Sequence, residues 1–291
     1  MSCTSERISL FDLHCDTLYE LHEKRLPFQN GQTMINARTA ANFAPYRQVF
    51  ALWSNHHETP EEQWARYRSS IEYLPQAGLP QGALLGVEGA SLLDGKMERL
   101  EQLAADGVRV LTLVWRDECC IGGAYNTSVG FTDFGRAVVQ ACERLNIIVD
   151  YSHASDEMIK EGLSLPGRMI CSHSNSREVF GHRRNLRDDY FNELIARGGV
   201  VGLSMCGTHI AESPTYDALI DHYEHFLSLG GEAHLCLGCD FDGISSAPAG
   251  FVDQSSLLDF YRALRARGHG RETLEKLFYR NAADYFSFCA V

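Results

Sequence analysis

The sequence lacks an apolar run of about 18 residues, the length that a membrane-spanning helix needs. It also lacks a proline- or serine-rich linker, a block of like charges and any low-complexity segment. Basic residues are outnumbered, with 26 lysines and arginines against 38 aspartates and glutamates, so the formal net charge is −12. A chain of this charge offers no broad basic surface, and neither nucleic acid nor an anionic membrane is expected as a partner.

The ends of the chain and its cysteines favour a cytoplasmic location. The first residues lack the charged-then-apolar order of a signal peptide, and residues 279–291 lack the polar spacer of a lipid-anchor signal. Ten cysteines are scattered through apolar stretches of a chain too large to depend on disulfides, so we expect mostly buried thiols in a reducing compartment. Cys236 and Cys239 are three apart, which sends them to opposite faces of a strand, and we interpret them as core residues.

Short apolar runs alternate with amphipathic stretches, a pattern typical of parallel strands joined by helices. The predicted strands are 8–14, 47–53, 83–88, 108–115, 147–153, 168–173, 200–205 and 234–240. The predicted helices are 60–74, 96–105, 134–145, 156–163, 188–196, 216–229, 254–267 and 271–286. This uninterrupted series predicts an α/β fold, a single (β/α)8 TIM barrel over residues 1–291, with its site at the C-terminal ends of the strands.

The first predicted strand ends in Phe11-Asp12-Leu13-His14-Cys15-Asp16. Because side chains alternate along a strand, His14 and Asp16 point the same way. An imidazole and a carboxylate that project together form half of a metal site. Taken alone, the pair also fits a helix-capping aspartate beside a hydrogen-bonded histidine.

Further polar residues end other predicted strands, namely Glu88, His153, His173 and Asp240. A barrel gathers its strand ends into one rim, so these groups are expected to converge with His14 and Asp16. Three imidazoles and three carboxylates exceed the needs of one tetrahedral ion and suit two divalent ions that share a carboxylate. The mixed nitrogen and oxygen donors favour Zn²⁺, with Mn²⁺, Fe²⁺ or Co²⁺ as alternatives.

Chemistry assigns roles within this set. Glu88, between Gly86 and Gly89, is the expected bridging ligand; His14 and Asp16 complete one ion, and His153 and His173 the other. A hydroxide held between two such ions is a nucleophile near neutral pH. Asp240 is the expected catalytic residue, which orients the water, takes its proton and passes it to the leaving amine.

The sequence resembles the membrane dipeptidase (renal dipeptidase) family, a binuclear-zinc branch of the amidohydrolase barrels, nearly end to end. The motifs that carry the resemblance are Leu13-His14-Cys15-Asp16, Gly86-Val87-Glu88-Gly89, Asp150-Tyr151-Ser152-His153, Ser172-His173-Ser174, Arg183-Arg184-Asn185 and Gly238-Cys239-Asp240-Phe241-Asp242-Gly243. The resemblance implies that the matched residues are metal ligands, with Glu88 bridging and Asp240 as the acid/base. It implies hydrolysis of dipeptides, with a D-residue tolerated at the C-terminal position, and a homodimer is common in the family.

Substrate binding by Arg184 is also implied by the resemblance, since its position matches the family's binder of the dipeptide carboxylate. Two departures bear on the substrate. Trp115 replaces a family histidine that polarises the substrate carbonyl, so Asn126 or a metal ion is expected to take that role near Trp115. Ser204-Met205-Cys206 stands where mammalian members carry a tyrosine.

Two other functions stay open: a related amidohydrolase acting on a cyclic amide, a lactone or an N-acyl amino acid, and a non-catalytic barrel. Other histidines are interpreted as structural. His56 and His57 are assigned to a loop, and His222 and His225, three apart on a helix, to a solvated surface because their spacing fits no zinc-protease pattern.

Overall fold

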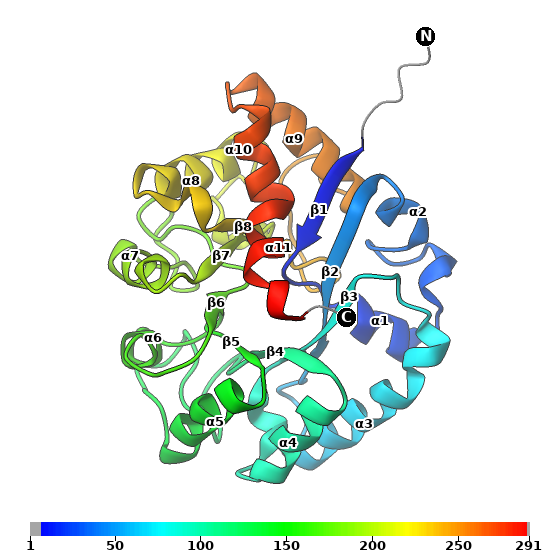
Figure 1. The fold of residues 1–291 in the computed structure, drawn as a ribbon, viewed down its shortest axis with the longest axis vertical. Helices are drawn as coiled ribbons and strands as arrows, with labels where there is room; N and C mark the ends of the chain where they lie inside the picture. The colour runs from blue at the N-terminus through cyan, green and yellow to red at the C-terminus, as the bar shows by residue number, and fades with distance from the viewer. Residues whose placement is uncertain (1–6, 290–291) are drawn as a thin grey trace.

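Eight parallel strands close into a barrel in sequence order, and β8 pairs with β1. The computed structural model describes residues 7–289. The strands are β1 (Ile8–Asp12), β2 (Phe43–Trp53), β3 (Ala83–Glu88), β4 (Val108–Thr112), β5 (Ile148–Asp150), β6 (Met169–Cys171), β7 (Val200–Leu203) and β8 (Leu235–Leu237). Figure 1 shows helices arranged around these strands, which confirms the predicted (β/α)8 architecture.

The helices follow the predicted order and most begin within a residue of the prediction. They are α3 (Pro60–Ala77), α4 (Met97–Ala105), α5 (Asp133–Arg144), α6 (Asp156–Gly162), α7 (Asp188–Ala196), α8 (Tyr216–Ser228) and α9 (Leu257–Ala266). Side chains that accept backbone N–H bonds fix several starts, as Thr132 does for α5 and Ser155 for α6. The short helices α1 (Thr17–Lys24) and α2 (Ala37–Ala40) were not predicted, and the four residues of α2 are too few to show an apolar period.

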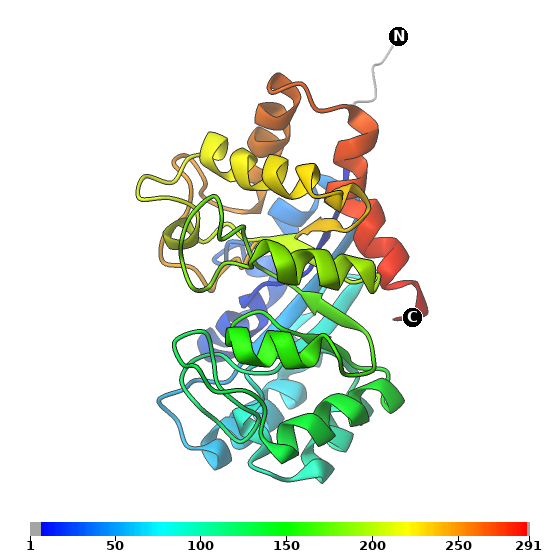
Figure 2. The ribbon, with the colours of Figure 1, turned by 90° about the vertical axis from the view of Figure 1, so that its left-hand side faces the viewer.

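The last predicted helix, 271–286, forms as three consecutive pieces. These are α10 (Arg271–Glu275), a π-helical turn η6 (Lys276–Arg280) and α11 (Asn281–Tyr285). Figure 2 shows these C-terminal helices at one end of the barrel and long loops at the other. No helix in the described part of the chain combines the length and the apolar character needed to cross a bilayer.

The apolar interior has two layers, because successive strand residues face opposite sides. One layer lies between the strands and the outer helices and includes Leu10 and Leu237. The other fills the barrel, where Phe11 and Cys236 meet Phe286 from the C-terminal segment. Cys236 and Cys239 fall in different layers, as predicted, and neither is exposed.

Strands β2 and β3 end where predicted, but the other six end two or three residues earlier, and this corrects the assigned boundaries. Strand β5 ends at Asp150 and β8 at Leu237, so His153 and Asp240 lie in the loops that follow. Both residues have a positive φ, 70° and 62° respectively, which an extended strand cannot contain. His153 and Asp240 therefore lie outside the hydrogen-bonded strands, and the positive φ at each of them turns the chain across the rim of the barrel.

The assignment of His222 to a solvated surface was wrong. His222 is fully buried on α8, where Nδ1 accepts the backbone N–H of Ser176 at 3.1 Å and Nε2 lies 2.9 Å from the carbonyl oxygen of Ile210. Its partner in sequence, His225, lies 2.8 Å from a carboxylate oxygen of Asp188. His222 thus connects α8 to the segments that contain Ser176 and Ile210, and His225 connects α8 to the start of α7.

We expect Phe286 to stabilise the closed end of the barrel. Its ring is fully buried, with its centroid 5.2 Å from that of Phe11. Phe286→Ala should lower the free energy of unfolding by about 3–5 kcal/mol, because it removes buried area and leaves a cavity. Urea denaturation measures this change. Val252→Ala, at a side chain that is 73% exposed, is the control and should change the value by less than about 0.5 kcal/mol. A loss below about 1 kcal/mol for Phe286→Ala would show that this residue does not close the core.

Candidate metal centre

Six predicted ligand and catalytic side chains converge at the C-terminal rim of the barrel. The Oε1 atom of Glu88 lies 2.9 Å from Nε2 of His153, 3.4 Å from Nε2 of His173 and 3.5 Å from Nε2 of His14. Ligand atoms of His14, Glu88 and His173 lie within 4.8 Å of one another, and so do those of His14, Asp16 and Asp240. The two groups share His14, and each of them could hold a metal ion.

The first pair of residues does not form a helix cap beside a satisfied histidine. Asp16 occupies the N-cap position of α1, yet its side chain makes no capping hydrogen bond within the described chain. Oδ1 of Asp16 and Nε2 of His14 are buried without a hydrogen-bond partner among residues 7–289 and lie 3.8 Å apart. Buried polar atoms of this kind are costly unless a cation or a donor satisfies them, so the pair fits a metal ion.

Burial sets the electrostatics of the cluster. It raises the pKa of Glu88 and of Asp16 well above the usual range, and their neighbouring carboxylates add to this effect. Burial lowers the pKa of His14 to about 4 and holds the pKa of His173 well below its usual value, so these imidazoles are neutral and can act as ligands. Burial also raises the pKa of Asp240 to about 7, against the opposing effect of Arg184.

Space for the carboxylates is provided by Gly243. A Cβ atom at this position would lie 2.3 Å from Oδ2 of Asp16 and 2.6 Å from Oδ1 of Asp240. Asp242 holds the same loop, because it accepts hydrogen bonds from Thr17 Oγ1 at 2.6 Å and from the backbone N–H of Met34 at 2.8 Å. Asp242 therefore fixes the loop, and Gly243 is the position that lets the carboxylates of Asp16 and Asp240 approach each other.

A cavity of about 460 Å³ opens beside the cluster. Its lining includes Asp16, Glu88, His153 and Asp240, together with Arg184. Arg184 is 5% exposed, donates from Nη2 to the carbonyl oxygen of His173 at 3.3 Å, and leaves Nε without a partner in the described chain. A buried guanidinium with free donors, next to the metal ligands, can bind a carboxylate at two points.

Arg183, the neighbour of Arg184, has a different environment. It donates from Nη2 to the carbonyl oxygen of Thr127 at 2.9 Å and is not part of the cavity lining. This agrees with its interpretation as a structural residue.

Trp115 lies in the cavity wall, and Asn126 does not. The centroid of the Trp115 ring lies 5.0 Å from that of Trp53 and 5.9 Å from that of His153. The backbone carbonyl oxygen of Trp115 lies 3.0 Å from Nδ1 of His153. Asn126 is exposed, and both ends of its amide bind Asp117, at 2.9 Å and 2.6 Å. The structure thus corrects the assignment of Asn126 to the substrate site, because its hydrogen-bonding groups are used within their own loop.

Several lining residues were missed by the sequence analysis. They are Tyr19, Trp53, Tyr125, Cys206, Thr208 and His209. The loop after β7, which carries Cys206 and His209, was singled out only for its departure from the family pattern. These residues have no common spacing, so only the folded rim brings them together.

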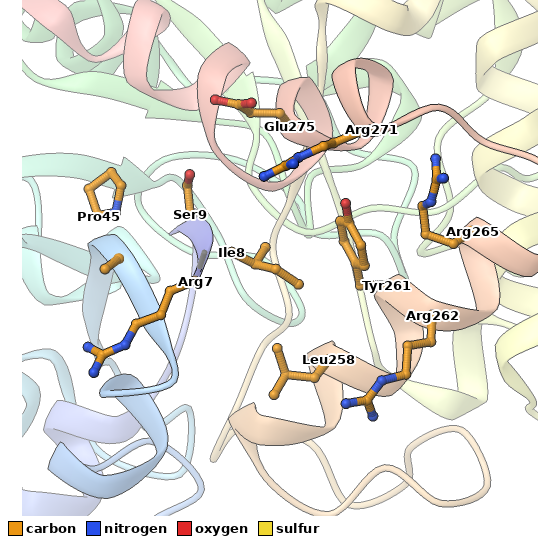
Figure 3. A pocket seen from close by; sticks show the side chains of 11 residues that line it. Arg7, Ile8, Ser9, Pro45, Leu258, Tyr261, Arg262, Arg265, Arg271 and Glu275 are labelled. Carbon is orange, nitrogen blue, oxygen red and sulfur yellow. The ribbon is translucent and has the colours of Figure 1, made fainter. Parts of the chain in front are cut away.

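A second cavity, of about 610 Å³, lies at the opposite end of the strands. Figure 3 shows it between the start of β1 and the arginines of α9 and α10, Arg262, Arg265 and Arg271. Its described lining contains one carboxylate, Glu275, and no histidine or cysteine. It lacks the ligand set of the rim, so the chemistry belongs to the smaller cavity.

The sequence is similar to known proteins over most of its length. Residues 63–284 match the family model described as membrane dipeptidase (peptidase family M19). An uncharacterized dipeptidase of Schizosaccharomyces pombe is 31% identical over 210 residues, which is 68% of this chain and 51% of that protein. Dipeptidase 3 of Mus musculus is 31% identical over 216 residues, 70% of this chain and 43% of that protein. The chain therefore spans about half the length of these relatives.

Solved structures share the fold. A dipeptidase described as a metallopeptidase of family M19 superposes with a TM-score of 0.88 at 22% identity, covering 97% of this chain and 98% of that one. A metallopeptidase of Rhodobacter sphaeroides, solved with a phosphinate mimic of the dipeptide L-Ala-D-Ala, gives a TM-score of 0.86 at 21% identity, covering 97% and 99%. His14 and Asp16 precede the matched range of the family model, but the barrel brings them to the same rim.

We expect Glu88→Gln to abolish stabilisation by zinc. In the unaltered chain, zinc at 100 times its Kd should stabilise the fold by about 2.7 kcal/mol, because the ion binds only the folded state. The variant keeps the shape of the side chain but loses the charge that can lie between two ions. Elemental analysis and thermal unfolding with zinc or a chelator measure the effect. Glu101→Gln, at an exposed glutamate, is the matched control, and equal zinc content in the two variants would contradict the prediction.

Gly243→Ala should lower zinc affinity by about 10–100-fold, since the new methyl group displaces the predicted ligand Asp16 together with the neighbouring carboxylate of Asp240. The matched control is Gly181→Ala, where an added Cβ has no described atom within 4 Å. Competition with a chromogenic chelator measures the affinity, and circular dichroism verifies the fold. Unchanged affinity in Gly243→Ala would show that the space beside Asp16 and Asp240 is not needed for metal binding.

Proposed function

This chain belongs to the membrane dipeptidase family, and we propose that it is a metallo-dipeptidase that hydrolyses dipeptides with a free C-terminal carboxylate. The observation that carries the proposal is the pairing of two features in one cavity: the ligand cluster around Glu88 and the buried guanidinium of Arg184. A metal site alone would suit many hydrolases. The adjacent guanidinium, which forms no ion pair with a carboxylate among residues 7–289, would select a substrate with a carboxylate at a fixed distance from the bond to be broken.

The proposed metal site would hold two divalent ions, for which the mixed nitrogen and oxygen donors favour Zn²⁺. His14 and Asp16 would hold one, His153 and His173 the other, and Glu88 both. When bound, the two ions supply Lewis acidity for the amide carbonyl and activation of the attacking water. The proposal is supported by the approach of one Glu88 oxygen to the Nε2 atoms of all three histidines and by the neutral state that burial favours for the imidazoles.

The remaining steps are assigned to side chains of this chain. Arg184 would bind the substrate carboxylate and thereby orient the scissile amide. Asp240 would take a proton from the attacking water and deliver it to the nitrogen of the leaving amine, which separates as the C–N bond breaks. Its carboxylate oxygen lies 3.8 Å from Nε2 of His14, so it can act where the substrate meets the ligands.

Trp115 bears on the choice of substrate. Its side chain packs between the rings of Trp53 and His56, 5.0 Å and 4.7 Å away, and brings an apolar wall where the family pattern has an imidazole. We propose that this wall contacts the substrate side chain and that polarisation of the carbonyl depends on the metal ions alone. The ligand of the Rhodobacter sphaeroides metallopeptidase supports including dipeptides with a C-terminal D-residue among the substrates.

We also propose a cytoplasmic location, on the cysteine pattern, and a homodimer, on the family resemblance. Neither changes the chemistry assigned to the rim. Gel filtration with light scattering measures the oligomeric state directly.

The test is turnover of a panel of L,L and L,D dipeptides by the full chain loaded with zinc or manganese. Arg184→Met should raise KM for dipeptides by about 10–100-fold, because the carboxylate loses charge-assisted hydrogen bonds. It should affect C-terminally amidated analogues much less. Arg183→Met, the matched control, should leave both unchanged.

Absence of turnover on the whole panel would refute the dipeptidase proposal. Hydrolysis of N-acyl amino acids, cyclic amides or lactones that is insensitive to Arg184→Met would instead establish a related amidohydrolase. A chain that binds no metal and hydrolyses none of these compounds would be a non-catalytic barrel.

A further inference from the structure

A chain of hydrogen bonds runs beneath His173, outside the cavity. It begins at Asp150, the last residue of β5, whose carboxylate is fully buried. Oδ1 accepts the backbone N–H groups of Ser152 at 2.9 Å and Ser172 at 2.8 Å. Oδ2 accepts the hydroxyls of Thr112 and Ser172, each at 2.6 Å. Four donors therefore surround this carboxylate, and it is held in one orientation.

The hydroxyl of Ser172 has a single hydrogen, and the geometry determines where it points. Its short contact is with a carboxylate oxygen of Asp150, which has no hydrogen to give when ionised. Ser172 must donate there, so towards Nδ1 of His173, 2.7 Å away, its oxygen can only accept. Nδ1 of His173 then carries the hydrogen, and Nε2 keeps a free lone pair.

Nε2 of His173 is the atom that faces the candidate metal centre. It lies 3.0 Å from Nε2 of His153 and 3.4 Å from Oε1 of Glu88. His153 reaches the same tautomer by a simpler route, since its Nδ1 lies 3.0 Å from the carbonyl oxygen of Trp115, which can only accept. Both histidines thus carry their hydrogen on Nδ1, which is fixed by a backbone carbonyl for His153 and by the hydroxyl of Ser172 for His173.

We propose that Asp150 and Ser172 form a positioning relay that fixes His173 in the Nδ1–H tautomer and so keeps Nε2 available to a metal ion. The inference rests on the metal-binding role proposed above for His173. A hydrogen-bonded carboxylate that orients a ligand histidine usually contacts the imidazole directly. Here the hydroxyl of Ser172 is inserted between them, and Thr112 ties the relay to β4.

Asp150→Asn gives the sharpest test, because it can reverse the relay. The asparagine Oδ1 can still accept the two backbone N–H groups, which leaves its NH₂ group facing the hydroxyl of Ser172. Ser172 would then accept from Asn and donate to Nδ1 of His173, which forces the hydrogen onto Nε2. An amide in place of an orienting carboxylate selects the wrong histidine tautomer in hydrolytic triads by the same logic.

The experiment reads the tautomer directly, by long-range ¹H–¹⁵N correlation in the full chain with labelled histidine after removal of metal by a chelator. Circular dichroism confirms that each variant is folded. His173 should be Nδ1–H in the unaltered chain and Nε2–H in Asp150→Asn, with zinc affinity reduced about 10–100-fold. Ser172→Ala, which breaks the relay without reversing it, should also lower zinc affinity. Ser172→Thr, which retains the hydroxyl, should restore it.

Ser54→Ala is the matched control, since this buried serine donates to the carbonyl oxygen of Gly89 at 2.6 Å and is not part of the relay. It should leave the tautomer of His173 and the zinc affinity unchanged. An Nε2–H tautomer in the unaltered chain, or full zinc affinity in folded Ser172→Ala, would overturn the relay. Zinc binding without dipeptide turnover would refute the dipeptidase proposal and leave the relay intact, so the two failures are distinguishable.

Discussion

The close approach of one carboxylate oxygen to three imidazole nitrogens is the constraint on which the rest of the rim depends. Oε1 of Glu88 lies within 3.5 Å of Nε2 atoms from His14, His153 and His173, and two more carboxylates lie beside His14. Such a concentration of buried polar groups costs free energy that protons or cations must offset. The surrounding strands and loops bring these groups together and keep their lone pairs free.

Backbone geometry at the strand ends makes this convergence possible. Strands β5 and β8 stop short, and positive φ values at His153 and Asp240 turn the chain across the rim. Non-glycine residues in this region are uncommon and tend to occur at functional sites. Gly243, which has no side chain, leaves space for the carboxylate of Asp240. Beneath His173, hydrogen bonds from Asp150 through Ser172 hold the imidazole in place. The site is thus supported from the backbone, from the adjacent loop and from the layer below.

The cavity combines a cation on one side with an aromatic wall on another. Arg184 is buried with an unpartnered Nε, whereas Trp53 and Trp115 pack edge to face in the wall. In the proposed function the two features would bind different parts of a small substrate: the guanidinium a carboxylate, and the rings an apolar side chain.

The sequence determined the barrel, the order of its elements and the six side chains that converge at the rim, because each of them lies at or just after the end of an apolar run. It also distinguished Arg184 from Arg183 and separated Cys236 from Cys239, the first through the family motif and the second through strand alternation. Six of the eight strand ends were predicted two or three residues too late, since a positive φ such as that of His153 or Asp240 does not show in the hydropathy pattern.

Only the tertiary structure decided which side chains share the cavity. Asn126 is used by Asp117 in its own loop, His222 is buried between segments, and Tyr19 and His209 join the rim from loops with no common spacing. The relay from Asp150 to His173 is likewise tertiary, because it depends on the register between β5 and β6 and on the direction of a single hydroxyl hydrogen. Local sequence encodes periodicity and chemical type, whereas contacts between distant loops depend on how the closed barrel orients each strand end.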